Sequence, residues 1–305
     1  MTSDAMKAIT QQTLGGPDVL ETVRVPIPRP GDGEVLVRVA ATSINAADWK
    51  LRSGVVTRLG PPPLTLGFDL SGVVTEVGAG VTEFAPGDEV FGNIVSRNGA
   101  YAEYVVVPGE FLTRKPVEID HVHAAALPTA ALTAWQALTE VQPGQRVLVH
   151  AAAGGVGHLA VQMAKARGAY VIGTARAANH EFLRGLGADE LIDYTTTDFT
   201  TAVADVDIAF DLVGGDYSER SLLVLTPNGR VIDAQGEEPL ADPRYYRLYF
   251  HPSGADLAEV AALVVAGRLR GEIDRVMSLA DIAEAHKLSE SGRVRGKIVL
   301  TPWTD

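Results

Sequence analysis

Cysteine is absent from the 305-residue sequence, which excludes a disulfide framework, a thiolate nucleophile and every zinc site built on cysteine ligands. Long runs of one charge sign are also absent, although the formal net charge is −12. An acidic surface of this kind is expected to repel nucleic-acid phosphates and anionic membranes. No stretch reaches the roughly 18 apolar residues of a membrane span, and the start lacks a signal-peptide pattern. We therefore expect a soluble, cytoplasmic protein with no nucleic-acid or membrane partner.

The composition that is present describes a globular chain, because 46% of the residues are apolar and 21% are charged. Short alternating runs between residues 35 and 109 predict antiparallel strands. Past residue 120, helical segments alternate with short β-branched runs, which predicts a doubly wound parallel sheet. The tail, with strands near 273–277 and 297–300, is expected to rejoin the first part. The predicted fold is α/β, with a β-rich domain over 1–122 and 268–305 and a Rossmann domain over 123–267.

The strongest motif is Val-Leu-Val-His-Ala-Ala-Ala-Gly-Gly-Val-Gly at residues 147–157, followed by a helical segment. A strand, a tight glycine turn and a helix N-terminus together form a binding site for a pyrophosphate, whose charge the helix N–H groups and dipole stabilise. The predicted pyrophosphate contacts are Ala153, Gly154, Gly155 and Val156. A purely structural glycine turn is the alternative.

The residues after this turn predict the cofactor. A fold that prefers NAD places Asp or Glu about 20 residues past the loop, at the end of the second strand. No carboxylate occurs between Gly157 and Glu181, and the strand instead ends in Thr174, Ala175 and Arg176. Because a guanidinium binds phosphate through two charged hydrogen bonds, NADPH is the predicted cofactor. The alternative for Arg176 is a solvated loop cation.

Seven blocks in order carry a family resemblance. They read Gly-Gly-Pro-Asp-Val-Leu at 15–20, Gly-Glu-Val-Leu-Val-Arg-Val at 33–39, Asn-Ala-Ala-Asp-Trp-Lys-Leu-Arg-Ser-Gly at 45–54, Gly-Phe-Asp-Leu-Ser-Gly-Val-Val at 67–74, Phe-Ala-Pro-Gly-Asp-Glu-Val-Phe-Gly at 84–92, the glycine loop at 151–157, and Gly-Arg-Val-Arg-Gly-Lys-Ile-Val-Leu at 292–300. On these blocks nearly the whole chain resembles the zinc-independent medium-chain dehydrogenases/reductases of the quinone oxidoreductase (zeta-crystallin-like) branch. The resemblance implies a GroES-like catalytic domain with the Rossmann domain inserted, an active site between them, and commonly a homodimer.

Zinc alcohol dehydrogenases of the same superfamily carry Cys where this chain has Asn45, and a His-Glu pair where it has Phe68 and Asp69. With the thiolate and imidazole ligands replaced, no metal site is predicted.

The resemblance also suggests the site residues. It implies that Asn45 and Thr133 lie beside the nicotinamide, and that Tyr194 joins Thr174 and Arg176 at the 2′-phosphate. It further places Val213 and Gly214 near the nicotinamide-side ribose and Lys297 near the cofactor. The residues alone also allow purely structural roles. Asn45 could cap a turn, Thr133 could lie inside a helix, Tyr194 could pack at a strand end, and Val213 and Gly214 could form a simple turn. For Lys297 a solvated position at a strand end is favoured.

The substrate is less well defined. Quinone oxidoreductases often carry Tyr where this chain has Lys50, and enoyl-thioester reductases often carry Tyr where it has Val55. Lys50 is therefore a candidate proton donor, although a surface ion pair with Asp48 or Asp69 is favoured.

The predicted reaction is NADPH-dependent hydride transfer to a quinone or an α,β-unsaturated carbonyl compound without zinc, in which positioning supplies much of the rate. The alternatives are an enoyl-thioester or polyketide tailoring reductase and a non-catalytic NADPH-binding protein.

Overall fold

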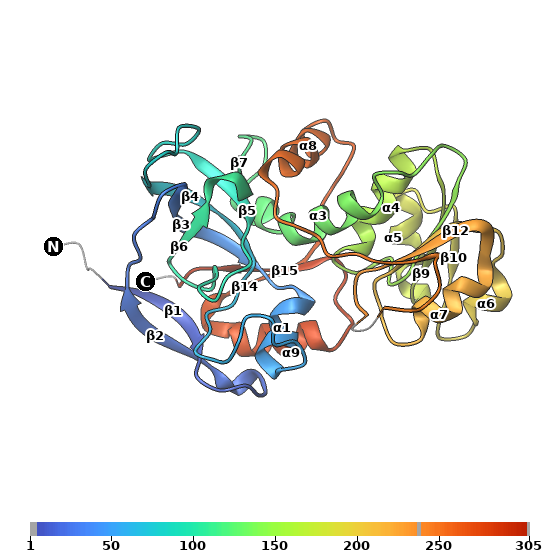
Figure 1. Ribbon diagram of the computed structural model, residues 1–305, viewed down its shortest axis with the longest axis horizontal. Coiled ribbons are helices and arrows are strands. Elements are labelled where there is room, and N and C mark those ends of the chain that lie inside the picture. Colours follow the sequence, from blue (N-terminus) through green and yellow to red (C-terminus); the bar gives the residue numbers. More distant parts are fainter. Residues whose placement is uncertain (1–4, 237–238, 304–305) are drawn as a thin grey trace. The chain divides into compact units, whose positions relative to one another are not determined.

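The computed structural model describes residues 5–236 and 239–303, which form two compact units (Figure 1). The first unit contains Met1–Thr129, Pro252–Val265 and Gly271–Asp305, and the second contains Ala130–His251 and Ala266–Arg270. Of the predicted domain ranges, residues 1–4, 237–238 and 304–305 lie outside the described residues.

The first unit is built on a mostly antiparallel sheet with the strand order β14-β15-β3-β4-β5-β7, in which β6 also pairs with β3. Alternate residues of the long strand β3, including Val35 and Val37, pack with Leu70 and Val74 of β4 in the core of this unit. The strand bounds are β3 Glu34–Ser43, β4 Asp69–Val77, β5 Glu89–Asn93, β6 Tyr104–Pro108, β7 Leu112–Arg114, β14 Ile273–Ser278 and β15 Lys297–Thr301.

A two-stranded sheet and several helices complete the first unit. The strands β1 (Ala5–Gln11) and β2 (Leu20–Pro26) pair with each other, and neither was predicted from the sequence. Helix α1 (Ala46–Ser53) packs against α9 (Ile282–Glu290), and their apolar residues join the same buried cluster (Figure 1). The remaining helices are α2 (His121–Ala125), α3 (Pro128–Ala137), which continues into the second unit, and α8 (Gly254–Val265).

The closing strand belongs to the first unit, because β15 pairs antiparallel with β3 at Val299–Ser43 and Leu300–Thr42. The boundary prediction differs from the structure at three places; residues 123–129 and helix α8 belong to this unit rather than to the nucleotide domain. Helix α8 packs on β7, and a side chain at Gly254 would overlap the Leu112 carbonyl oxygen. Conversely, residues 268–270 belong to the second unit, because the Gln162 side chain binds both the backbone N–H and the carbonyl of Arg270.

The second unit confirms the predicted Rossmann-type sheet. Its described strands are all parallel, in the order β10-β9-β8-β11-β12-β13, so the order reverses between β8 and β11. In such sheets, ligands bind outside the carboxyl ends of the strands at this point. The strand bounds are β8 Arg146–Val149, β9 Tyr170–Thr174, β10 Glu190–Ile192, β11 Val206–Asp211, β12 Leu225–Asp233 and β13 Tyr245–Arg247; the helix bounds are α4 Gly157–Ala166, α5 His180–Gly185, α6 Phe199–Ala202 and α7 Tyr217–Ser221.

None of the helices in the described part of the chain is long and apolar enough to cross a membrane.

Candidate functional site

A fully buried carboxylate, Asp69, lies at the centre of a polar network in the first unit. Its Oδ1 accepts hydrogen bonds from the backbone N–H and the hydroxyl of Thr129, at 2.7 and 2.6 Å, and from the Asn93 amide at 3.4 Å. Thr129 is in the first turn of α3, where backbone N–H groups have no acceptor within the helix and the Asp69 carboxylate supplies one. The first residue of β4 is thereby tied to the start of α3.

The second oxygen of Asp69 binds the end of β3 and the start of α1. Oδ2 accepts hydrogen bonds from the Ser43 hydroxyl at 2.6 Å and from the Asn45 Nδ2 at 2.8 Å. Lys297, at the start of β15, places its Nζ at 3.3 Å from the same oxygen. Asn45 and Asp69 stand where zinc alcohol dehydrogenases carry metal ligands, and here the two side chains contact each other directly.

Lys297 is buried, with only 3% of its surface exposed, so the expected solvated strand-end lysine is wrong. Its Nζ donates to the Asn45 Oδ1 at 2.5 Å and to the Ile44 carbonyl at 2.8 Å, in addition to its ion pair with Asp69. The pairing of β15 with β3 brings this side chain to the end of β3, where Ser43 is the last residue of the strand and Asn45 follows as the N-cap of α1. Its proposed approach to the cofactor stays a prediction.

A second buried carboxyl, Asp48, lies one turn into α1. Its oxygens accept hydrogen bonds from the backbone N–H groups of Asn45 and Gly67, at 2.8 and 2.9 Å. Burial nevertheless raises the pKa of Asp48 from 3.8 to about 7, because desolvation outweighs these two hydrogen bonds. Burial and the neighbouring Asp48 and Asp69 carboxylates also raise the pKa of Tyr101.

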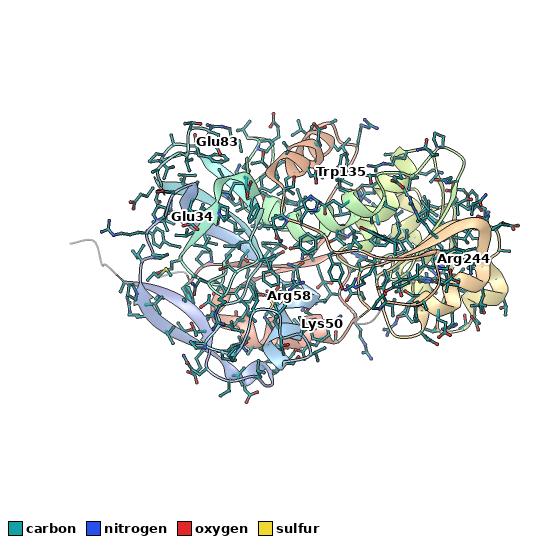
Figure 2. All side chains as sticks on the ribbon, in the orientation of Figure 1. Glu34, Lys50, Arg58, Glu83, Trp135 and Arg244 are labelled. Carbon is teal, nitrogen blue, oxygen red and sulfur yellow. The ribbon has the colours of Figure 1, made fainter. Side chains whose placement is uncertain are left out.

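The two other predicted catalytic residues lie on helices. Lys50 is on α1 and only partly buried, with its Nζ 5.9 Å from the centre of the Trp49 ring (Figure 2). Asp48 and Asp69 are fully buried, so neither offers Lys50 the surface ion pair that the sequence suggested. Thr133 is buried on α3, four residues after Thr129, so both project from the same face of the helix. The catalytic roles of Lys50 and Thr133 stay predictions.

The glycine loop of the second unit leads from β8 into α4. Ala151 has a positive φ of 48°, and a side chain at Gly157 would overlap the Ala151 carbonyl oxygen, so only glycine fits there. The backbone N–H groups of Gly155, Val156 and Gly157 have no hydrogen-bond partner within the described residues. A tight loop with free N–H groups at the N-terminus of a ten-residue helix fits a pyrophosphate.

The predicted 2′-phosphate residues separate into two groups. Arg176 and Tyr194 follow β9 and β10, are both exposed, and form a hydrogen bond between Arg176 Nε and the Tyr194 hydroxyl at 3.0 Å. Thr174 is instead 1% exposed, and its hydroxyl bonds the His150 ring and the Ala151 N–H at 3.2 and 3.3 Å. Thr174 therefore supports the glycine loop from inside the fold, and its neighbour Ala175 is also buried.

Sequence reasoning missed three aspartates that hold the loops at the carboxyl edge of this sheet. Asp211 accepts hydrogen bonds from the N–H groups of Val213 and Gly214 at 2.8 and 3.0 Å, and Asp233 does the same for the loop after β12. Asp193 accepts from the Ala177 N–H at 3.1 Å and so links the loops after β10 and β9. The signal was available, because each Asp stands at the end of a short apolar run.

Val213 and Gly214, predicted near the nicotinamide-side ribose, follow Asp211 at this edge. Gly214 and Gly215 both adopt positive φ angles, of 83° and 64°, which favour glycine. The glycines are thus required by the turn itself, and contact with a ribose stays a prediction.

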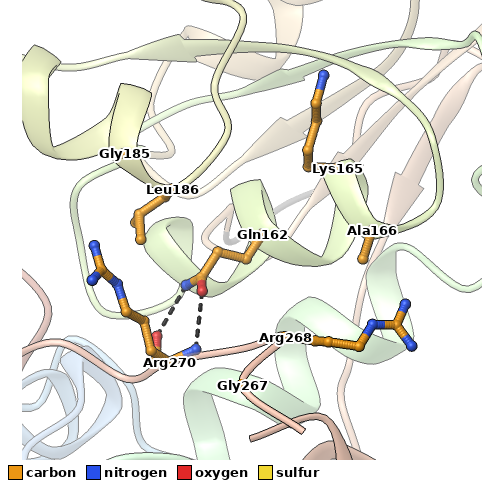
Figure 3. A pocket seen from close by; sticks show the side chains of 8 residues that line it. All are labelled: Gln162, Lys165, Ala166, Gly185, Leu186, Gly267, Arg268 and Arg270. Carbon is orange, nitrogen blue, oxygen red and sulfur yellow. Dashed lines mark hydrogen bonds between the residues drawn. The ribbon is translucent and has the colours of Figure 1, made fainter.

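A separate surface pocket of about 460 Å³ lies between the ends of α4 and α5 and residues 267–270 (Figure 3). Three basic residues line it, but Figure 3 shows the Arg268 and Arg270 side chains pointing to opposite sides. The third, Lys165, forms an ion pair with Asp189 at 2.7 Å. These cations do not converge on one anion, so we assign no ligand to this pocket.

Comparisons with known proteins match both units. An alcohol dehydrogenase GroES-like domain model matches residues 31–117, and a zinc-binding dehydrogenase model matches residues 186–300. A chloroplast envelope quinone oxidoreductase homolog of Arabidopsis thaliana is 34% identical over 99% of this chain and 100% of the relative. A chloroplastic NADPH-dependent alkenal/one oxidoreductase of the same plant is 33% identical over 88% of this chain and 72% of the relative. The structure of a quinone oxidoreductase from Coxiella burnetii matches with a TM-score of 0.91 and 38% identity, covering 97% of this chain and 99% of that one.

A Rossmann-type sheet with an open glycine loop, joined to a GroES-like unit with a buried polar site, defines an oxidoreductase of the dehydrogenase class. The chain belongs to the medium-chain dehydrogenase/reductase superfamily, in the quinone oxidoreductase branch, as its resemblance predicted. Oxidoreductases of this family use a nicotinamide cofactor.

The zinc in the name of one family model does not fit the residues of this chain. No group of three or more His, Asp or Glu side chains in the described residues is arranged to hold a metal ion. Asn45, Phe68 and Asp69 occupy the former ligand places, and the Lys297 ammonium already binds both polar ones. A second cation there would meet like charge at close range.

Replacing Gly157 by alanine should weaken nucleotide binding. The new methyl group would press on the Ala151 carbonyl and shift the loop whose N–H groups are open to a pyrophosphate. We expect the Kd for NADPH, measured by fluorescence titration, to rise at least about tenfold. Gly185→Ala in α5 is the control, because its methyl group would approach no atom closer than 4.0 Å. Unchanged NADPH binding by Gly157→Ala would contradict this assignment of the loop.

Asp48 should make stability depend on pH. Its pKa is raised in the folded state, so between about pH 4 and pH 7 the folded chain holds a proton that the unfolded chain has lost. This stabilisation is complete below pH 3.8 and is lost as the pH rises through about 7. The free energy of unfolding, relative to that of Asp48→Asn, should fall by at most about 1.4 kcal/mol per pH unit between about pH 5 and 7 and level off above that. Denaturant titrations that show a constant difference across this range would refute the prediction.

Proposed function

We propose that this chain reduces a quinone or an α,β-unsaturated carbonyl compound with NADPH and without zinc. The relatives named quinone oxidoreductase and alkenal/one oxidoreductase support this acceptor class. The Arg176–Tyr194 pair at the ends of β9 and β10 is the observation that carries the choice of NADPH.

The second unit would hold the cofactor by its backbone and by one exposed cation. The N–H groups of Gly155, Val156 and Gly157 are open to a pyrophosphate, and Arg176 is open to a further phosphate next to Tyr194. The Tyr194 hydroxyl holds the Arg176 Nε and leaves the terminal nitrogens for the phosphate oxygens. When bound, NADPH supplies the hydride.

The first unit would supply the polar contact for the acceptor. A hydride added to a quinone or enone leaves negative charge on the acceptor oxygen, which then takes a proton from solvent. One N–H of Asn45 Nδ2 donates to Asp69, and the other has no acceptor among the described residues. That second N–H is suited to bind the acceptor oxygen as charge develops on it.

Zinc should be absent from the purified protein and unnecessary for its activity. The thiolate and imidazole that usually bind zinc are replaced in this chain. The Lys297 ammonium already binds Asn45 and Asp69, the two polar residues that stand in their places. Elemental analysis should find no stoichiometric zinc, and the rate of NADPH oxidation should survive incubation with a chelator. Activity that falls in chelator and returns on adding zinc would overturn this part of the proposal.

Arg176 should select NADPH over NADH. A charged hydrogen-bonded contact contributes roughly 1.5–3 kcal/mol, so Arg176→Ala should lower kcat/KM for NADPH about 10- to 100-fold and leave that for NADH nearly unchanged. Arg184→Ala is the matched control, because it removes an exposed arginine from the same unit. Added salt should erode the wild-type preference.

Equal losses with both cofactors in Arg176→Ala would instead indicate general destabilisation. A wild type that uses NADH as well as NADPH would show that the cofactor assignment is wrong.

The acceptor class is tested by following NADPH oxidation with 1,4-benzoquinone, 9,10-phenanthrenequinone, 2-alkenals and a crotonyl thioester. Turnover of the quinones or alkenals supports the proposal. Turnover of the thioester alone would favour an enoyl-thioester reductase. Tight NADPH binding without turnover of any acceptor would favour a binding protein.

A further inference from the structure

We propose that Lys297 is a positioning residue whose buried ammonium, together with Asp69, fixes the orientation of the Asn45 amide. The inference rests on the function proposed above and concerns the same site. The ammonium binds the oxygen of the Asn45 side chain at 2.5 Å, and the carboxylate binds its nitrogen at 2.8 Å. The amide is therefore held between a full positive and a full negative charge.

The chemistry of these contacts permits only one orientation of the amide. An ammonium is a donor only, and an ionised carboxylate is an acceptor only. If the Asn45 amide flipped, its NH₂ would face the Lys297 ammonium and its oxygen would face the Asp69 carboxylate. Both contacts would be repulsive, and both buried charges would lose a hydrogen bond. The free N–H of Nδ2 is consequently fixed in place.

The exposure of the three residues places Asn45 on the outside of this group. Asp69 is 0% exposed, Lys297 3% and Asn45 9%. A molecule that approaches from solvent thus meets the Asn45 amide before either charge. Lys297 acts through Asn45 rather than by touching the acceptor, and its charge is cancelled locally by Asp69.

The Lys297–Asp69 ion pair also stabilises the fold. The experiment must therefore distinguish a loss of stability from a loss of the Asn45 orientation. Lys297→Met alone leaves the Asp69 carboxylate buried without its cation, so a loss of stability is expected in either case. The double variant Lys297→Met/Asp69→Asn removes both charges. In it, the NH₂ of the amide introduced at position 69 can donate to the Asn45 oxygen, which allows the Asn45 amide to turn over.

The test compares stability with turnover in these two variants. With 1,4-benzoquinone as acceptor, we expect Lys297→Met, in which only Asp69 still holds the amide, to lower kcat about tenfold, and the double variant about 10- to 100-fold, each with an unchanged Kd for NADPH. The double variant should recover much of the Tm but not the kcat. Wild-type kcat in either variant would show that Lys297 is only structural. Failure of both variants to fold would equally overturn the positioning role.

Lys115→Met is the matched control. Lys115 is also a buried lysine of the first unit, with 5% of its side chain exposed and an ion pair to Glu89 at 2.9 Å, but it does not contact Asn45. It should lower the Tm and leave kcat unchanged. A comparable loss of kcat in this control would assign the effect of Lys297→Met to stability.

A second measurement does not depend on turnover and separates this inference from the proposed function. In protein labelled with ¹⁵N asparagine, the Asn45 side-chain N–H that donates to Asp69, identified with Asn45→Ser, should exchange slowly with water in the wild type. Its exchange should become fast in the double variant. Equal exchange rates would refute the fixed amide even if the enzyme reduces quinones, whereas slow exchange without any quinone reduction would refute only the proposed function.

Discussion

The Asp69 carboxylate is the contact on which the geometry of the first unit depends. A buried carboxylate is stable only if its oxygens are hydrogen-bonded and its charge is paired. Its donors come from the ends of β3 and β5 and from the starts of α1, α3 and β15. These segments are far apart in the sequence, so the need to satisfy one charge brings their ends to a single point.

Aspartates also hold the loops of the second unit, but most of their partners are backbone N–H groups close by in the sequence. Asp211 and Asp233 end two strands of the parallel sheet, and Asp193 directly follows a third. Each accepts hydrogen bonds from backbone N–H groups of the loop that follows its own strand or a neighbouring one. These N–H groups are thereby occupied. The N–H groups after Gly154 in the glycine loop have no such carboxylate and stay open. Among the described residues of this edge, the glycine loop therefore keeps its backbone N–H groups open to an anion.

Sequence patterns over short stretches were sufficient to predict the parts of the fold that depend on residues close together in the chain. The parallel strands and the glycine turn were predicted because β-branched runs and small residues determine them over short stretches. The position of α8 was not, because it depends on the close approach of Gly254 to Leu112, a residue far earlier in the chain. The burial of Lys297 was also missed, since it depends on Asp69 and Asn45, which only the pairing of β15 with β3 brings near it.

The ammonium of Lys297 differs from a metal ion in what it can do for a substrate. Zinc at such a site accepts a substrate oxygen as a ligand and polarises it directly. An ammonium whose contacts are the Ile44 carbonyl, the Asn45 amide and the Asp69 carboxylate has its three N–H groups occupied, so it has none to offer. Its charge can act on a bound acceptor only through the orientation of its partners. The reaction proposed above would suit such a site, because quinones and enones need little polarisation and their products delocalise the added charge.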